Sequence, residues 1–278
     1  MKIPFTKMHG AGNDFVLIDD RDLTVPWQDY LRMAALAARR LGVGCEGIIL
    51  IQPSDRADFR MRFLNPDGTE VELCGNGARC CAAFANRLGA AGKAMTMETL
   101  AGLVDAEIAD TGVKIWMPDP AARRYDLSVE VDGRIFDGHA ITIGVPHFVT
   151  PVTDLAALDV ARYGSLIRQH ATFAPQGVNV DFVQFSAGNR IQMRTYERGV
   201  EAESGACGTG AVAAAIVAIE RGDFTLPVCV TTSTGFELQV DGDWRTRKCT
   251  GMTLTGPVKT VFEGVIDLDG LLLDIEAK

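Results

Sequence analysis

Two stretches of this chain have nearly the same pattern: LCGNGARCC at residues 73–81 and ACGTGAVAA at residues 206–214. Each places an apolar residue, a cysteine and a glycine before a small polar residue and a second glycine, and an alanine-rich apolar run follows. Glycines directly before an apolar run predict a tight turn that opens a helix. The chain is therefore expected to form the same cysteine-bearing turn twice.

The spacing of the two stretches predicts an internal duplication. Cys74 and Cys207 lie 133 residues apart in a chain of 278, which is close to half its length. In each half a strand-like segment, FRMRFLN or IQMRTYE, leads through a loop to the cysteine and then to a helix. Because strand, turn, cysteine and helix recur in order, we expect two similar α/β domains. Chance similarity between two glycine-rich helix starts is the alternative.

The rest of the chain alternates short β-rich runs with turns, and few segments have helical periodicity. The segment MPDPAARRYD, residues 117–126, carries two prolines and leaves the strand pattern, so it is the predicted linker. The expected fold class is therefore α/β (α+β), with one central helix in each of two domains.

Composition and charge exclude several classes of protein. Apolar residues make up 47% of the chain and charged residues 23%, as in ordinary globular proteins. A net charge of −9, without a cluster of Lys and Arg, argues against a nucleic-acid partner, because phosphate binding needs clustered cations. The longest apolar run, residues 211–219, is too short to cross a bilayer, and the first residues lack the apolar segment of a secretory signal. A cytoplasmic protein without membrane contact is expected.

The seven cysteines are an odd number, which predicts free thiols in a reducing compartment. No C-x-x-C pair occurs in the sequence, so no structural zinc site and no other metal is expected. Five cysteines are expected to be inert core or surface thiols: Cys45, Cys80, Cys81, Cys229 and Cys249.

The other two, Cys74 and Cys207, stand where a thiol can become reactive. A glycine-rich helix start leaves backbone N–H groups unpaired, and with the helix dipole these groups bind anions and lower the pKa of a thiol. Two such turns are expected to face one shared cleft. One thiol could then remove a proton from a carbon while the other delivers a proton to its opposite face, with the N–H groups holding the developing charge. This chemistry needs no cofactor, and none is expected.

Longer motifs resemble a known family. MHGAGNDFVLID, LNPDGTEVELCGNGARC, VNVDFV and RTYERGVEAESGACGTGA follow in this order between residues 7 and 215, and together they strongly resemble diaminopimelate epimerase. The resemblance implies interconversion of LL- and meso-2,6-diaminopimelate, for lysine and peptidoglycan precursors, without pyridoxal phosphate or metal. It also implies a homodimer of chains with two pseudo-symmetric domains, each a curved mixed β-sheet or barrel wrapped around a central helix.

In that family the C-terminal strand usually returns to the first domain. The resemblance therefore implies a first domain of residues 1–118 with 264–278, which carries Cys74, and a second of residues 119–263, which carries Cys207.

The resemblance also implies site residues. Cys74 and Cys207 resemble the two acid/base residues, and His147 and Glu197 resemble residues that tune the two thiols. The small and polar residues after each cysteine would hold the carboxylate at the reacting centre, and the fork-shaped guanidinium of Arg198 suits a distal carboxylate. The positions that resemble substrate-binding residues are Asn13, Asn65, Gly75, Asn76, Asn179, Glu197, Arg198, Gly208 and Thr209.

Two stretches depart from the family's pattern. Many members have GNPH where this chain has GVPHF, so Val145 replaces an asparagine that contacts the distal end of the substrate. Gly47 stands where some members place a contacting glutamine, beside Glu46 in place of an aspartate. These departures leave a second function open, racemisation of another amino acid, such as histidine or a cyclic imino acid, by the same two-thiol mechanism.

Two functions of other classes are further alternatives. A thiol hydrolase or transferase would use Cys207 as nucleophile and His147 as base, and it would need only one cysteine. A carboxylate-binding module would use the two turns to hold a ligand without chemistry.

Overall fold

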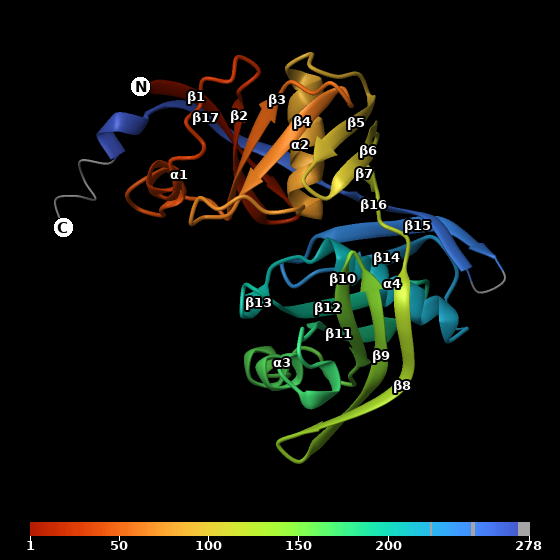
Figure 1. The fold of residues 1–278 in the computed structure, drawn as a ribbon. Coiled ribbons are helices and arrows are strands. Elements are labelled where there is room, and N and C mark those ends of the chain that lie inside the picture. Colours follow the sequence, from red (N-terminus) through yellow and green to blue (C-terminus); the bar gives the residue numbers. More distant parts are fainter. Residues whose placement is uncertain (223, 246–247, 272–278) are drawn as a thin grey trace. The chain divides into compact units, whose positions relative to one another are not determined.

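The structure, a computed structural model, describes residues 1–222, 224–245 and 248–271 (Figure 1). In this part of the chain, strands predominate and five helices accompany them, so the predicted mixed α/β class is confirmed. The chain divides into two compact units: Met1–Ile115 with the chain from Gly256 onward, and Trp116–Thr255. Residues 272–278, the end of the predicted first domain, lie outside the described residues.

Eight strands form the sheet of the first unit. Neighbouring strands are antiparallel except for two parallel pairs, β2 with β3 and β4 with β5. In order across the sheet the strands are β17 (Val258–Asp267), β1 (Lys2–Gly10), β2 (Asn13–Asp19), β3 (Gly47–Gln52), β4 (Phe59–Leu64), β5 (Ala94–Thr99), β6 (Gly102–Ala109) and β7 (Gly112–Trp116).

The sheet of the second unit has the same sequence of antiparallel and parallel neighbours. Its parallel pairs are β10 with β11 and β12 with β14, and a short strand, β13 (Ala202–Ser204), adds to β12. In order across the sheet the strands are β8 (Ala121–Val131), β9 (Arg134–Ile143), β10 (Val145–Pro151), β11 (Asn179–Ser186), β12 (Arg190–Glu197), β14 (Val228–Thr231), β15 (Glu237–Arg245) and β16 (Lys248–Gly256).

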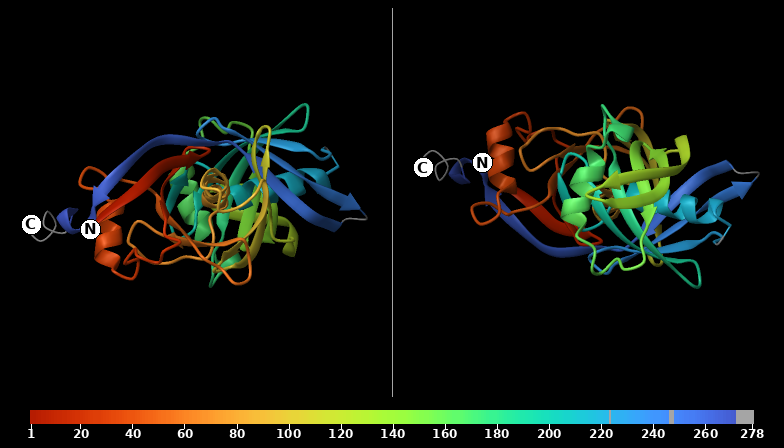
Figure 2. Two further views of the ribbon diagram at one scale, coloured as in Figure 1. Left: turned by 90° about the horizontal axis from the view of Figure 1, so that it is seen from above. Right: turned by 90° about the horizontal axis from the view of Figure 1, so that it is seen from below.

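Each unit contains one helix that meets many of its strands. The helix α2 (Gly75–Arg87) contacts β1, β2, β3, β4, β6 and β17, and Figure 2 shows it nearly end-on in the left view. The helix α4 (Gly208–Glu220) contacts β9, β10, β11, β12, β14 and β15. Most residues of both helices are buried among these strands, which fits their alanine-rich sequences.

Each shorter helix provides the crossover connection of one parallel pair, and α2 and α4 provide it for the other two, because parallel strands need such a connection. The helix α1 (Tyr30–Ala37) lies between β2 and β3, and α3 (Val160–Arg168) lies between β10 and β11, followed by the 3-10 turn η1 (Ala171–Phe173). An aspartate caps the start of each: the side chain of Asp29 accepts from Arg32 N, and that of Asp159 accepts from Arg162 N. Among the described residues, no helix has the length and apolarity needed to cross a bilayer.

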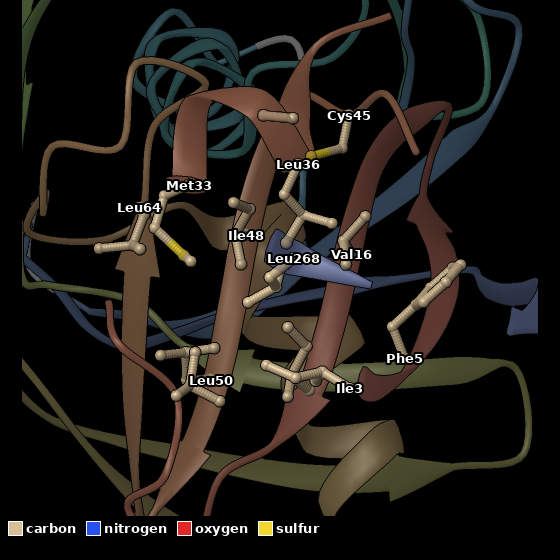
Figure 3. Close-up of a cluster of buried hydrophobic side chains, with 13 residues drawn as sticks. Ile3, Phe5, Val16, Met33, Leu36, Cys45, Ile48, Leu50, Leu64 and Leu268 are labelled. Atoms are coloured by element: carbon tan, nitrogen blue, oxygen red, sulfur yellow. The ribbon is translucent and has the colours of Figure 1, made fainter. Parts of the chain in front are cut away.

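The core of the first unit gathers around α1 and the neighbouring strands. Met33 and Leu36 of α1 pack with Val16, Ile48 and Leu50 of the sheet, as Figure 3 shows. All six residues of β3 are buried, because α1 and α2 both contact this strand. Its continuous apolar run, GIILIQ, is typical of a strand covered on both faces.

The segment 117–126, predicted to be a linker, is partly a strand. Its two prolines precede β8, which begins at Ala121 and pairs with β9. The register of this pairing shifts between Arg124 and Leu127, and Asp126 there has a φ of 51°. The irregular stretch interrupts the alternation of apolar and polar residues from which a strand is predicted, so the sequence pattern did not indicate a strand here.

We expect Leu50→Ala to lower the free energy of unfolding by about 2–5 kcal/mol, because it leaves a cavity in the core. Leu50 is 0% exposed, whereas Leu103 of β6 is 52% exposed. The matched variant Leu103→Ala should change the free energy of unfolding by less than about 0.5 kcal/mol. Urea unfolding followed by circular dichroism measures both, and equal losses would contradict the placement of Leu50 in the core.

Candidate functional site

The two cysteines of the repeated motif occupy equivalent places in their units. Cys74 is the N-cap of α2 and Cys207 is the N-cap of α4, each with extended backbone and each before a helix of 13 residues. Neither side chain makes a capping hydrogen bond, and neither helix has an acidic residue in its first turn. The first N–H groups of each helix, at the positive end of its dipole, therefore favour an anion beside the cysteine.

In the first unit, the Cys74 thiol lies in a cluster of amides. Its Sγ donates to Asn13 Oδ1 over 3.5 Å, and Asn76 Nδ2 donates to the same oxygen over 3.2 Å. The Nδ2 of Asn13 donates to the carboxylate of Glu46. The structure thus brings together three residues of the predicted site, and it adds Glu46, which the sequence indicated only as a departure from the family's pattern.

Arg79 is a member of this cluster that the sequence reasoning missed. It is fully buried, and it donates from Nη2 to Asn76 Oδ1 over 2.6 Å and from Nη1 to Gly75 O over 3.3 Å. Burial lowers the pKa of its guanidinium, whereas the Cys80 and Cys74 thiols act to raise it. The signal that could have found it is an arginine inside the alanine-rich run of a helix expected to be buried.

Asn65, also predicted to bind substrate, follows β4 in a tight turn. Its backbone N donates to Thr69 O over 2.8 Å, and its own carbonyl accepts from Gly68 N over 2.9 Å. The backbone of Asn65 is therefore used to close the turn, and its side-chain role stays a prediction.

In the second unit, Cys207 lies next to a buried histidine–carboxylate pair. His147 Nδ1 and Asp181 Oδ2 are 2.7 Å apart, and both side chains are fully buried. Thr195 Oγ1 donates to the other oxygen of Asp181, also over 2.7 Å. One ring nitrogen, one carboxylate oxygen and the Cys207 Sγ all lie within 4.8 Å of one another. The predicted His147 is therefore part of the surroundings of Cys207.

Asp181 is the second residue that the sequence reasoning missed. It lies on β11 in the motif VNVDFV, where a charged residue interrupts a buried apolar strand. A Cβ atom at position 210 would come within 2.4 Å of Asp181 Oδ1, so the second glycine of CGTG lets α4 approach the carboxylate. Carboxylate, imidazole and thiolate are zinc ligands. Here, however, hydrogen bonds from neighbouring side chains already hold Asp181, so the cluster does not need an ion to keep its shape.

The surroundings of Cys207 keep its thiol protonated. Burial raises the pKa of Cys207 well above its ordinary value, and the carboxylates of Glu197 and Asp181 raise it further. Hydrogen bonds from Thr209 and from the backbone of Gly210 act in the opposite direction. The Sγ of Cys207 and the Oγ1 of Thr209 are 3.5 Å apart. A group that can take the proton is therefore needed before Cys207 can serve as a base.

Three further residues predicted to bind substrate lie where β11 begins and β12 ends: Asn179, Glu197 and Arg198. Asn179 is buried and stands opposite His147 in the parallel pairing of β10 and β11. Its Oδ1 accepts from the backbone N of Arg198 over 2.7 Å, and Arg198 Nη1 donates to Gln176 O over 3.3 Å. Asn179 thus fixes the end of β12, where Glu197 and Arg198 follow each other.

The structure gives a physical reason for one departure from the family's pattern. A Cβ atom at Gly47 would lie 2.4 Å from the ring of Phe63, so this backbone has no room for the glutamine of other members. Val145 opens β10, opposite Ile143 and two residues before His147. Val145 therefore places an apolar side chain at the start of the strand that carries His147.

Comparisons with known proteins match most of the chain. The family model described as diaminopimelate epimerase matches residues 5–123 and 139–261. A diaminopimelate epimerase of Aquifex aeolicus (strain VF5) is 42% identical over 273 residues, which cover 94% of this chain and 96% of that protein. One of Archaeoglobus fulgidus is 38% identical over 294 residues, which cover 99% of this chain and 100% of that protein.

Solved structures share the fold at lower identity. A Bacillus anthracis phenazine biosynthesis protein of the PhzF family is 17% identical with a TM-score of 0.75, over 96% of this chain and 99% of that one. A hydroxyproline epimerase from Agrobacterium vitis is 18% identical with a TM-score of 0.73, over 96% and 93%. These two matches show the fold alone, whereas the family model and the relatives near 40% identity show descent. The chain therefore belongs to the diaminopimelate epimerase family, whose members are isomerases of lysine biosynthesis.

Proposed function

We propose that this chain converts LL-2,6-diaminopimelate to meso-diaminopimelate, a precursor of lysine and peptidoglycan, with Cys74 and Cys207 as its two acid/base residues. The observation that carries the proposal is that both cysteines are N-caps of 13-residue helices in units with the same order of strand pairings. The relatives' name, diaminopimelate epimerase, supports the substrate.

The reaction requires the two thiols to reach opposite faces of one α-carbon. One cysteine, as thiolate, takes the α-proton, and the other, as thiol, gives its proton to the opposite face. The carbanion between these steps keeps its charge next to the substrate carboxylate, which the N–H groups at the helix starts bind. In the direction from meso to LL the two cysteines exchange roles, and no cofactor takes part.

His147, held by Asp181, can accept the proton that Cys207 has to lose before it serves as a base. The Nε2 of His147 has no hydrogen-bond partner among the described residues, while Nδ1 is held by Asp181. A proton that moves from Cys207 Sγ to His147 leaves the total charge of the buried cluster unchanged, and Asp181 stabilises the imidazolium that forms. Glu197, whose carboxylate disfavours the thiolate, favours return of the proton to Cys207.

The residues predicted to bind substrate fall into two groups, one for the reacting centre and one for the rest of the substrate. Gly75 and Asn76, and Gly208 and Thr209, lie at the helix starts and would bind the carboxylate of the reacting centre. The amides and cation that would bind the rest of the substrate are Asn13, Asn65, Asn179 and Arg198. Glu197, whose carboxylate acts on Cys207, would bind substrate near the reacting centre.

A racemase of another amino acid is the second candidate, with the same two thiols. It is favoured by Val145, an apolar residue in place of a contacting asparagine, and by Gly47, where no side chain fits. The loss of two polar contacts would weaken recognition of a second amino-acid head.

We also propose that the two units arose by duplication and correspond to the two pseudo-symmetric domains of the family's fold, for which the predicted bounds are residues 1–118 with 264–278 and residues 119–263. The identical order of strand pairings and the equivalent contacts of α2 and α4 support this proposal. A cytoplasmic homodimer stays a prediction from the family resemblance, and light scattering during gel filtration would measure the size of the assembly.

We expect both Cys74→Ala and Cys207→Ala to lower the turnover of LL-diaminopimelate by about 10²–10⁴-fold, because each removes one proton-transfer group. Conversion followed by chiral chromatography measures this loss. Cys229→Ala is the matched control, since Cys229 is a half-buried thiol of β14 outside the two helix starts. Substantial turnover in the Cys74→Ala protein would favour the one-cysteine hydrolase instead.

Exchange of the α-hydrogen in D₂O separates the two candidate substrates. LL-diaminopimelate, L-histidine and trans-4-hydroxy-L-proline are incubated with the protein, and incorporation of deuterium is followed by NMR. We expect exchange with LL-diaminopimelate, because the family's proteins carry its name. Exchange with one of the other two and none with diaminopimelate would replace the proposed substrate while keeping the mechanism.

Asp181→Asn should lower kcat by about 10²-fold, because the amide cannot stabilise a protonated His147. The Michaelis constant should change little, since Asp181 lies behind the histidine. Asp132→Asn provides the control, because Asp132 is exposed and pairs with Arg162 at the surface. Full activity of the Asp181→Asn protein would refute the proton path from Cys207 to His147.

A further inference from the structure

Arg79 is a fully buried cation near the start of a helix. A charge in this place is costly for two reasons: the guanidinium loses its hydration, and the helix dipole already puts positive charge at the same end. Its Nη atoms donate to Asn76 and Gly75, and its buried Nε has no hydrogen-bond partner among the described residues. No carboxylate of the described chain forms an ion pair with it, so its charge needs another counter-ion.

Two cysteines, Cys80 and Cys74, favour the charged form of Arg79 when they are ionised to thiolates. Burial raises the pKa of Cys80 far above its ordinary range, so Cys80 stays a neutral thiol. Cys74 is only half-buried and lies at the helix start, where an anion is favoured. Of the two thiols, only Cys74 can therefore supply the negative charge.

The charged side chains of the elements that surround α2 have partners of their own. Lys7 of β1 and Arg39 pair with Asp14 of β2, and Arg62 of β4 pairs with Glu70. The other charged or titratable groups with partners are His9 of β1 with the backbone of Gly12, Glu46 with Asn13, Arg60 with Glu70, Asp105 with Thr96, Glu107 with Lys114, and Arg87 with Glu263. Lys259 of β17 is exposed.

A chain of hydrogen bonds joins Arg79 to the thiol. Arg79 only donates, so it fixes the orientation of the Asn76 amide: the oxygen faces the guanidinium and the NH₂ group faces away from it. That NH₂ group donates to Asn13 Oδ1, the same atom to which Cys74 Sγ donates. The guanidinium of Arg79 thereby keeps the NH₂ group of Asn76 directed toward the Asn13 oxygen to which Cys74 is also bonded.

We propose that Arg79 is the counter-ion of the Cys74 thiolate and a positioning residue that keeps the Asn76 amide oriented toward it. This inference deepens the proposed function, on which it rests for the use of the thiolate, but its test needs no substrate. Because Arg79 is fully buried, it would act on the cysteine from the protein interior.

The test is the pH dependence of alkylation of Cys74 by iodoacetamide in the free protein, with each cysteine followed by peptide mass spectrometry. In the unchanged protein the apparent pKa of Cys74 should lie below about 8.5, the ordinary value for a thiol. A value at or above the ordinary one would overturn the proposal, and this measurement does not depend on whether any variant folds.

Arg79→Met should raise the apparent pKa of Cys74 by at least about one unit, which lowers its alkylation rate near pH 7 about tenfold. Arg87→Met is the matched control, because Arg87 lies on the same helix and is 39% exposed in a pair with Glu263. Its pH profile should equal that of the unchanged protein. An unchanged profile in a folded Arg79→Met protein would overturn the proposal.

The same variants separate this inference from the proposed epimerase reaction. If Arg79→Met changes the Michaelis constant for LL-diaminopimelate but not the alkylation profile, Arg79 serves substrate binding and the counter-ion role is wrong. If no amino acid exchanges its α-hydrogen while the alkylation profile shifts as expected, the proposed function fails and the role of Arg79 stands.

Discussion

A helix has several backbone N–H groups at its start that the helix itself cannot satisfy. In both units the residue at this place is a cysteine whose side chain makes no capping bond. Glycines follow each cysteine, and at Gly210 the absence of a side chain is required by the carboxylate of Asp181, 2.4 Å from where a Cβ would lie. Both helix starts therefore favour an anion beside the cysteine, and the residues around each thiol have to be compatible with this.

The two units share their strand order but differ in the charges around the thiols. Cys74 has the buried cation Arg79 as a charged neighbour, whereas Cys207 has the carboxylates of Asp181 and Glu197. A cation favours a thiolate and carboxylates favour a thiol. A reaction in which one thiol group takes a proton and the other gives one needs one thiolate and one protonated thiol before it begins. The two units provide it, because the same order of strand pairings puts the thiols at equivalent positions while the charged neighbours of the thiols differ.

The parts of the molecule that could be predicted from sequence are those with a local signal. The glycine pattern predicted helices that begin after Cys74 and Cys207, and both begin there. The mixed α/β class followed from alternating segments. Arg79 and Asp181 were missed, because a charged residue is usually exposed and only the surrounding strands reveal that these two are buried. The crowding of Gly47 by Phe63 likewise depends on β4, a neighbour that comes from later in the chain.

The pairing of β17 with β1 joins Lys2 to Asp267 and so connects nearly the first residue of the chain with one of the last. Synthesis on the ribosome proceeds from the N-terminus, so β1 emerges long before the strand that covers its open edge. The second unit is continuous in the chain and can form in full during that interval. The first unit, and with it the setting of Cys74, therefore reaches its final form only after β17 has been synthesised.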